Sequence, residues 1–479
     1  MLFNSVEFAL FLPIVFFLYW AILKNTLRGQ QGLLLLSSYF FYGWWEVKFL
    51  LLIAFSTLID FWVGQKIEQA QQLKHKKLFL GVSLFVNLGS LAFFKYYNFF
   101  LDNFVQAFTL LGTSFEVTRL DIILPVGISF YTFQTLSYSI DIYKGKLKAS
   151  RDLVSFAGFV SFFPQLVAGP IERASHLLPQ FHQPKKFHHS EAVDGIRQIL
   201  WGLFKKVVIA DNCAIYANQI FETYYDLSGS TLLLGSIFFA FQIYGDFSGY
   251  SDMAIGLARL LGFRLMCNFS YPYFSRDAAE FWRRWHISLS TWFRDYLYIP
   301  LGGSRGGTWM KIRNTFLIFL VSGFWHGANW TFIAWGFINA CYFLPLLLSN
   351  KNRQHTTIVA ENRVLPTLKE LLQMLSTFAL TCGAWVFFRS NTLSQAIVYL
   401  KRIFTPSLFT PPEVFSASTL FFIVLLLLIE WLGRRKTYPL EFTPTSSISW
   451  QARWSIYMGL IICILLFGAN QQQFIYFQF

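Results

Sequence analysis

Long apolar runs, separated by short polar segments, fill the sequence from end to end. A helix needs about 20 apolar residues to cross the hydrocarbon core of a bilayer, at a rise of about 1.5 Å per residue. We therefore expect an all-α, polytopic integral membrane protein. The pattern predicts membrane-spanning or re-entrant helices over residues 7–23, 33–45, 47–64, 78–94, 122–140, 153–171, 198–210, 231–262, 314–350, 371–388, 414–429 and 455–469.

Three of these runs refine the expected topology. Residues 314–350 contain no Asp, Glu, Lys or Arg and are too long for one span, so they should hold two spans or a span and a re-entrant piece. Residues 161–170 are short and contain proline, which favours a re-entrant segment buried in protein. Residues 7–23 lack the basic flank and cleavage site of a signal peptide and are interpreted as a retained first span. We expect about 11 spans.

Basic residues concentrate in alternate connections. Residues 24–31, 66–77 and 144–152 are rich in Lys and Arg, whereas residues 95–121 are much less basic. Cytoplasmic loops carry the excess of positive charge in membrane proteins. These three basic loops are therefore expected in the cytoplasm, with the N-terminus outside. No internal repeat divides the chain, so residues 1–479 are interpreted as one membrane domain, with N-terminal helices in 1–120, a core in 121–390 and C-terminal helices in 391–479.

Composition narrows the class of protein. Hydrophobic residues make up 55% of the chain, aromatic residues 20% and charged residues only 13%, against about 25% charged in an average soluble domain. This excludes a water-soluble enzyme, a disordered chain and a fibrous repeat. The net charge of +14 is explained by basic cytoplasmic loops, and we expect no nucleic-acid partner. The five cysteines have no CxxC spacing, so neither a disulfide framework nor a zinc site is expected.

His326 is the most conspicuous polar residue. It lies in SGFWHGANW, inside the uncharged run 314–350, and an ionisable group in such a run is a functional candidate. On one continuous helix Ser322, His326 and Asn329 would share a face. A desolvated, neutral imidazole there could act as a general base, or could simply satisfy a hydrogen bond between helices.

His286 lies in a stretch rich in tryptophan and arginine. Trp282, Trp285, Leu289, Trp292 and Phe293 recur at helical spacing and predict an amphipathic helix with His286 on its apolar stripe. Residues 276–313 hold seven Lys and Arg against three Asp and Glu. The basic residues Arg283, Arg284 and Arg294 could form an entrance for a phosphate-bearing donor, or could anchor an interfacial helix.

Other polar groups have simpler explanations. Asp246 and Asp252 could line a reaction cavity or, more commonly, pair with arginines such as Arg259 or Arg264. The glycine-rich segment 302–307 matches no phosphate-binding fingerprint and is interpreted as a flexible loop.

Neither metal binding nor glycosylation is expected. No carboxylate or cysteine accompanies the loop histidines at metal-ligand spacing. The two N-x-S/T matches fall in or beside apolar segments and are attributed to chance. The residues concerned are His182, His188 and His189 for the histidines, and Asn268 and Asn329 for the N-x-S/T matches.

The two histidine segments together carry a family resemblance. FWRRWHISLSTWFRDYLYIPLGG and SGFWHGANW resemble the signature of the membrane-bound O-acyltransferases. MLFNSVEFALFLPIVFFLYW, YFFYGWW, ILPVGISFYTFQTLSYSIDIYKG, SFFPQLVAGPIERA, DFSGYSDMAIGLARLLGF and WVFFRS extend it nearly end to end. The branch resembled is that of the bacterial alginate O-acetylation proteins and peptidoglycan O-acetyltransferases, with the D-alanyl-lipoteichoic acid branch more distant.

This resemblance implies a fold and an activity. It implies a funnel-shaped bundle of about 11–13 transmembrane or re-entrant helices enclosing a tunnel. His326 matches the catalytic position and His286 the second histidine of the family. The family takes an acyl group from a cytoplasmic thioester and passes it to a hydroxyl or to a partner acetyltransferase. We expect acetyl-CoA as donor, no bound cofactor or metal, a periplasmic acetyltransferase partner, an exported polysaccharide as acceptor and a place in the bacterial inner membrane.

Within that scheme, His326 would deprotonate the accepting hydroxyl. The oxyanion would be stabilised by donors near Ser322, Asn329 and the indole of Trp285 or Trp325, an assignment that rests on the residues alone.

Other function classes use the same features. A transporter of a small acidic solute would also need intramembrane histidines and a basic mouth, although inverted repeats are not visible. A scaffold for a partner acetyltransferase, or transfer of D-alanyl or another acyl group to a cell-wall polymer, are the further alternatives.

Overall fold

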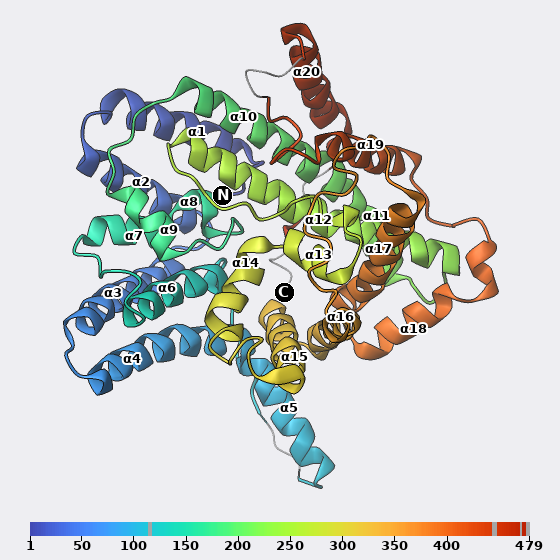
Figure 1. Ribbon diagram of the computed structural model, residues 1–479, viewed down its shortest axis with the longest axis horizontal. Coiled ribbons are helices and arrows are strands. Elements are labelled where there is room, and N and C mark those ends of the chain that lie inside the picture. The colour runs from blue at the N-terminus through green and yellow to red at the C-terminus, as the bar shows by residue number, and fades with distance from the viewer. Residues whose placement is uncertain (114–116, 443–447, 470–471, 476–479) are drawn as a thin grey trace. The chain divides into compact units, whose positions relative to one another are not determined.

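The computed structural model describes residues 1–113, 117–442, 448–469 and 472–475, and this part of the chain is helical without any β-strand. Its helices appear in chain order in Figure 1. They are α1 (Val6–Phe17), α2 (Leu27–Gly43), α3 (Lys48–Gln69), α4 (Leu73–Leu91), α5 (Tyr97–Leu110), α6 (Ile128–Tyr143), α7 (Leu153–Ser161), α8 (Phe163–Leu166), α9 (Ala174–Phe181), α10 (His189–Phe204), α11 (Asp211–Glu222), α12 (Gly229–Leu260), α13 (Ala278–Arg284), α14 (Ile287–Phe293), α15 (Gly307–His326), α16 (Trp330–Leu348), α17 (Leu368–Arg389), α18 (Leu393–Ile403), α19 (Ala417–Gly433) and α20 (Trp450–Phe467).

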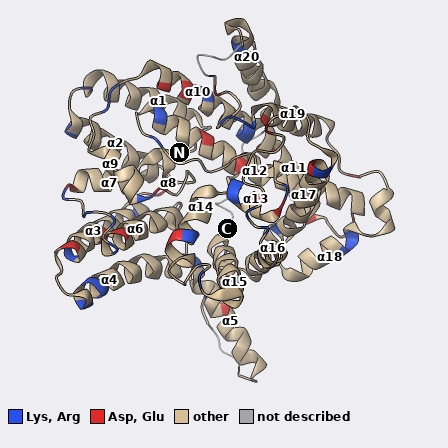
Figure 2. Ribbon diagram, viewed as in Figure 1, with Lys and Arg blue, Asp and Glu red and all other residues tan. Residues whose placement is uncertain are grey.

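Several helices are long and apolar enough to cross a membrane. Within the described residues six segments meet that standard: Lys48–Gln69, Leu73–Leu110, Gly229–Leu260, Trp330–Leu348, Leu368–Arg389 and Trp450–Phe467. Shorter apolar helices cover Val6–Ile22, Leu153–Leu166 and Ala417–Gly433. Charged residues gather at helix ends, as the first turn of α4 and the last turn of α18 illustrate (Figure 2). The chain is an all-α, multi-pass membrane protein, as the apolar pattern predicts.

The helices form two compact units. Unit 1 comprises Met1–Ala192 and Leu257–Met266, and unit 2 comprises Val193–Gly256 and Cys267–Phe479. The chain passes between the units within α10, within α12 and between Met266 and Cys267. Both candidate histidines belong to unit 2. The single membrane domain and the enclosed tunnel expected from the sequence stay predictions.

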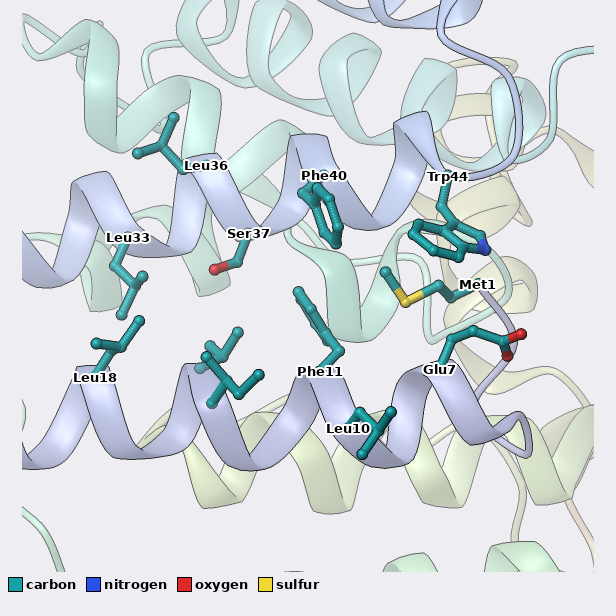
Figure 3. A pocket seen from close by; sticks show the side chains of 12 residues that line it. Met1, Glu7, Leu10, Phe11, Leu18, Leu33, Leu36, Ser37, Phe40 and Trp44 are labelled. Carbon is teal, nitrogen blue, oxygen red and sulfur yellow. The ribbon is translucent and has the colours of Figure 1, made fainter.

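Unit 1 is held together by apolar and polar helix contacts. Helices α3, α4 and α6 pack on one another, and a buried polar cluster centred on Asp60 joins them. Helices α1 and α2 form the walls of an apolar groove of about 530 Å³, with Glu7, Met1 and Trp44 near one end (Figure 3). Glu7 is the one ionisable side chain among the described residues that line this groove.

Local sequence explains where the helices break. The uncharged run 314–350 forms two helices, as its length predicts, because α15 ends at His326 and Asn329 caps α16. Gly323 and Gly336 let these two helices touch: a Cβ at Gly323 would come within 2.2 Å of the carbonyl oxygen of Phe332. Helix α5 lies within the segment 95–121, which the sequence analysis treats as a linker; α4 continues into it through a π-helical turn.

Candidate functional site

His326 is the last residue of α15 and is buried, with 5% of its surface exposed. Ser322 lies one turn earlier on the same helix and is also buried, as predicted. Asn329 does not share their face. The helix ends before it, its side-chain oxygen accepts from the backbone N–H of Thr331 at 3.0 Å, and its amide donates to the carbonyl of Asn391 at 3.0 Å. The expected three-residue polar stripe is therefore wrong at Asn329, because the chain leaves the helix at Gly327.

His286 lies at a break between two short helices. It is the N-cap of α14, with φ of +44°, and α13 ends two residues before it. The single amphipathic helix expected over this segment is therefore wrong. A non-glycine residue in the left-handed region is held there by its surroundings and is characteristic of functional sites. The side chain of His286 is only 1% exposed.

Hydrogen bonds fix the ring of His286. Its Nδ1 lies 3.1 Å from Oδ1 of Asn268, which is itself fully buried. Its Nε2 is buried and has no hydrogen-bond partner among the described residues. His286 lies outside the candidate spans, and burial lowers its pKa to about 3. The imidazole is therefore neutral at pH 7 and able to accept a proton.

Aromatic rings surround both histidines. The ring of Trp325 contacts both, with centroids 6.2 Å from His286 and 4.8 Å from His326. His326 also meets Trp335 edge-on at 5.2 Å and Phe388 at 5.2 Å. Such apolar walls exclude water, and they strengthen any hydrogen bond made inside.

Tryptophans from separate elements build this wall. Trp285 is 2% exposed and packs on Trp385 at 5.1 Å, and Trp385 stacks on Trp335 at 5.6 Å. The helical spacing of tryptophans noted in the sequence therefore reflects a shared aromatic core rather than one helix face.

A cavity of about 380 Å³ lies in unit 2, and neither histidine lines it. Exposed arginines, Arg283, Arg294 and Arg353, line it together with Ser322. Trp282 also lines it, and the indole nitrogen of Trp282 has no hydrogen-bond partner among the described residues. The cavity thus combines cationic groups with a polar group one helical turn from His326.

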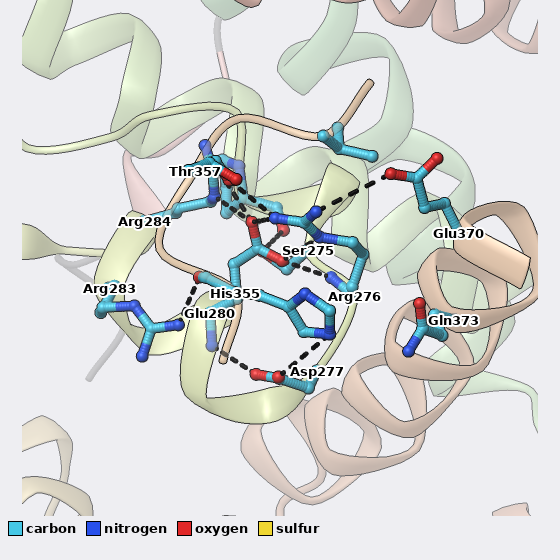
Figure 4. Close-up of polar contacts among 12 residues, drawn as sticks. Ser275, Arg276, Asp277, Glu280, Arg283, Arg284, His355, Thr357, Glu370 and Gln373 are labelled. Atoms are coloured by element: carbon cyan, nitrogen blue, oxygen red, sulfur yellow. Dashed lines mark hydrogen bonds and ion pairs between the residues drawn. The ribbon is translucent and has the colours of Figure 1, made fainter. Parts of the chain in front are cut away.

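The arginines in and just before α13 have specific partners of their own (Figure 4). Arg276 binds Glu280 through two nitrogens, at 2.9 and 3.0 Å, and Arg284 binds the same carboxylate at 2.8 Å. These cations hold the pKa of Glu280 below its usual range, although burial opposes them. Arg283 donates to the carbonyls of Asn352 and His355 at 2.8 and 2.7 Å.

These contacts distinguish the three arginines that the sequence analysis proposes for donor binding. Arg284 is committed to Glu280 and does not line the cavity, whereas Arg283 and Arg294 do. Arg294 also pairs with the adjacent Asp295 at 2.8 Å.

The carboxylates of α12 pair with lysines rather than with Arg259 or Arg264. Asp246 lies 2.7 Å from Nζ of Lys206, and Asp252 lies 2.6 Å from Nζ of Lys205. The expected ion pairing occurs, but the expected partners are wrong, because the lysines of the neighbouring π-helical turn are closer. Asp246 also accepts from the backbone N–H of Ile475 at 2.7 Å, which ties residues 472–475 to α12.

Metal-binding geometry is not found in the described part of the chain. No group of three or more His, Cys, Asp or Glu side chains there is placed to hold an ion. The five cysteines are free.

Three residues of the site were missed by the sequence analysis: Asn268, Trp282 and Arg353. Asn268 appears in the sequence as a glycosylation match, yet it is completely buried. Its contact with His286 depends on a hairpin-like approach of residues 268–270 to residues 284–288, which spacing along one helix could not indicate.

Comparisons with known proteins identify the family of the chain. The sequence profile of the membrane-bound O-acyltransferase (MBOAT) family matches residues 146–382, which include both histidines. The chain is 43% identical over 414 residues to the probable alginate O-acetylase AlgI of Pseudomonas aeruginosa, covering 85% of this chain and 75% of that protein. It is 39% identical to the protein of the same name from Pseudomonas putida over the whole of both chains.

A second kind of relative is named for a different acceptor polymer. The peptidoglycan O-acetyltransferase of Helicobacter pylori is 39% identical over 431 residues, covering 84% of this chain and 79% of that protein. These identities extend over most of each sequence. The chain therefore belongs to the membrane-bound O-acyltransferase family, as the segments around His286 and His326 predict, and is an acyltransferase.

Proposed function

We propose that this protein takes an acetyl group from cytoplasmic acetyl-CoA and transfers it towards hydroxyls of an exported polysaccharide. The relatives named above as alginate O-acetylase and peptidoglycan O-acetyltransferase support an O-acetyl group and a cell-envelope polymer. Alginate-type exopolysaccharide and peptidoglycan are both candidate acceptors. The protein would lie in the bacterial inner membrane with its N-terminus outside, and a periplasmic acetyltransferase would complete delivery.

The observation that carries this proposal is the position of the basic cavity. Arg283, Arg294 and Arg353 line it, and guanidinium groups match the geometry of phosphates such as those of coenzyme A. Ser322 lines the same cavity and lies one turn from His326 on α15. A donor with its phosphates on the arginines would thus direct its thioester towards the histidines.

The chemistry needs one base and a dry site. His326 accepts the proton of the attacking hydroxyl, whose oxygen forms a bond to the thioester carbonyl carbon. The carbon–sulfur bond then breaks, and the thiolate of coenzyme A leaves and takes up that proton. Ser322 and the indoles of Trp285, Trp325 and Trp282 are the donors we propose for the oxyanion. Asn329 is left out because its amide is bound to Asn391.

The test measures free coenzyme A released from acetyl-CoA by detergent-purified protein. Wild type should release it, at least slowly, and His326→Ala should lose this activity by about 100-fold or more with an unchanged thermal melt. His75→Ala is the matched control, because His75 is an exposed histidine of α4 in unit 1. Equal release by wild type and His326→Ala would overturn the role of His326. No release by wild type, with or without acceptor and partner, would overturn acetyl-CoA as donor.

A further inference from the structure

Asn268 bridges three elements around His286. It lies in the segment after α12, and its Oδ1 faces His286 Nδ1 at 3.1 Å, Ser288 Oγ at 2.8 Å and the backbone nitrogen of Ser288 at 3.3 Å. Its Nδ2 donates to Oγ of Ser251 on α12 at 3.1 Å. The Asn268 backbone carbonyl also accepts from the N–H of Ile287 at 2.9 Å. One buried amide thus holds the residues on both sides of the break in the chain.

The orientation of this amide fixes the tautomer of the histidine. A backbone N–H can only donate, so the Asn268 atom that faces the Ser288 N–H must be the oxygen. That same oxygen faces Nδ1 of His286. Nδ1 must therefore carry the ring proton and donate it, which leaves Nε2 of the neutral ring as an acceptor.

The other ring nitrogen of His286, Nε2, has no evident structural role. It is buried and without a hydrogen-bond partner among the described residues, and its ring contacts are the aromatic side chains of Phe247, Phe269 and Trp325. Leaving a buried acceptor unpaired lowers the stability of the fold, and such groups call for an explanation. A hydroxyl of a bound substrate is the partner that would satisfy it.

The backbone supports the same conclusion. His286 is held at φ of +44°, a left-handed conformation that strains the backbone of a non-glycine residue. An extended or helical His286 would point its ring elsewhere. Packing alone does not account for a strained backbone and an unpaired nitrogen at the same residue.

We propose that Asn268 is a positioning residue, which holds the His286 imidazole in the Nδ1–H tautomer so that Nε2 accepts a hydrogen bond from a hydroxyl of the bound substrate other than the one that His326 deprotonates. This inference rests on the proposed acyl transfer for its consequence, although the tautomer itself does not. Asp252, the residue after Ser251, forms an ion pair with Lys205 at 2.6 Å. Burial is the one cause of the depressed His286 pKa, so Asn268 sets the orientation of the ring without adding charge.

Two substitutions of Asn268 should change activity in different ways. Asn268→Ala removes the acceptor and lets the ring change tautomer, so kcat should fall by about 100-fold with little change in KM. Asn268→Asp keeps an acceptor for Nδ1 and adds negative charge, which favours the imidazolium. Above pH 8 the activity of Asn268→Asp should approach that of wild type. As the pH is lowered, the variant should lose activity at a pH at least one unit higher than the pH at which wild type loses it.

A matched control separates positioning from folding. Asn87 is a buried asparagine of unit 1 whose amide likewise both donates and accepts. Asn87→Ala should destabilise the protein but leave the pH profile per folded molecule unchanged. If Asn268 were merely structural, Asn268→Asp would also keep the wild-type profile, and that result would overturn the proposal.

A spectroscopic readout needs no turnover and is made on the wild-type protein, with one variant used only to assign the signal. In protein labelled with ¹⁵N-histidine, the His286 signal is the one absent from His286→Gln, and in wild type it should report a protonated Nδ1 and an unprotonated Nε2. A protonated Nε2 would overturn the proposal. Absence of coenzyme A release by wild type would instead contradict the proposed donor, while the tautomer signal would still stand or fall by itself.

Discussion

Two buried polar clusters, one in each unit, differ in whether their groups are paired. In unit 1, Asp60 is fully buried and accepts from Ser83, Asn87 and Ser139, while Thr135 donates to the amide oxygen of Asn87. In unit 2, the cluster around His286 leaves Nε2 without a partner among the described residues. The first cluster joins α3, α4 and α6; the second surrounds a break in the chain.

The difference separates structural from functional polarity. In an apolar setting, hydroxyl and amide groups that satisfy one another join helices and stabilise the fold. A buried group left unpaired lowers stability, and it is retained where a substrate will pair with it. We therefore expect changes in the Asp60 cluster to affect folding and changes at His286 to affect activity.

The largest expected effect is on the rate of His286→Phe. Removing the acceptor nitrogen leaves the substrate badly placed for proton transfer to His326, which should lower coenzyme A release by about 1,000-fold. The melting temperature should not fall, because an apolar ring replaces a buried polar group that lacked one partner. Turnover and thermal melts on the same preparation check both parts. A large loss of stability with normal turnover per folded molecule would contradict the comparison.

Asp60→Ala should produce the opposite pattern. It leaves the donors on Ser83, Asn87 and Ser139 without their common acceptor, at a cost of about 3 kcal/mol of stability. Coenzyme A release per folded molecule should stay at the wild-type level. Asp60→Asn is the milder variant, since its amide still accepts from some of these donors. A selective loss of turnover in Asp60→Asn would place this cluster in the reaction.

A smaller effect is expected at the cavity. Arg283→Gln removes a cation that faces the proposed donor, and the KM for acetyl-CoA should rise about tenfold, equivalent to about 1.4 kcal/mol, with kcat nearly unchanged. Arg402→Gln is a matched control, because Arg402 of α18 binds the carbonyl of Leu227 and does not line the cavity. Equal KM changes in both variants would point to general charge rather than to this cavity.

Sequence periodicity predicts the class of fold well and the site only in part. The helical class, the division of residues 314–350 and the burial of Ser322 and His326 follow from apolar runs and from the cost of polar groups within them. Helical spacing fails at Asn329 and at His286, because both lie where the chain leaves a helix.

The contacts between distant segments could not be predicted from spacing. The pairing of Asp246 with Lys206 and of His286 with Asn268 depends on how separate elements approach one another. A π-helical turn at residues 205–210 and a left-handed residue at 286 set these approaches, and neither has a periodic signal in the sequence.

The smallest expected effect comes from the paired cluster around Glu280, which lies in the same unit as His286 and so tests whether pairing, rather than position, sets the outcome. Arg276 and Arg284 lower the pKa of Glu280 in the folded protein, so its carboxylate stabilises the fold above the unfolded pKa of about 4.3. That contribution is lost as pH falls through the lower, folded pKa. Glu280→Gln should therefore cost about 1 kcal/mol at pH 7, with a difference in melting temperature that shrinks below pH 4, while turnover per folded molecule stays constant. If the difference in melting temperature between wild type and Glu280→Gln grew on acidification, Glu280 would not be held ionised by its arginines. The cluster around Glu280 would then not be an example of a paired, stabilising cluster.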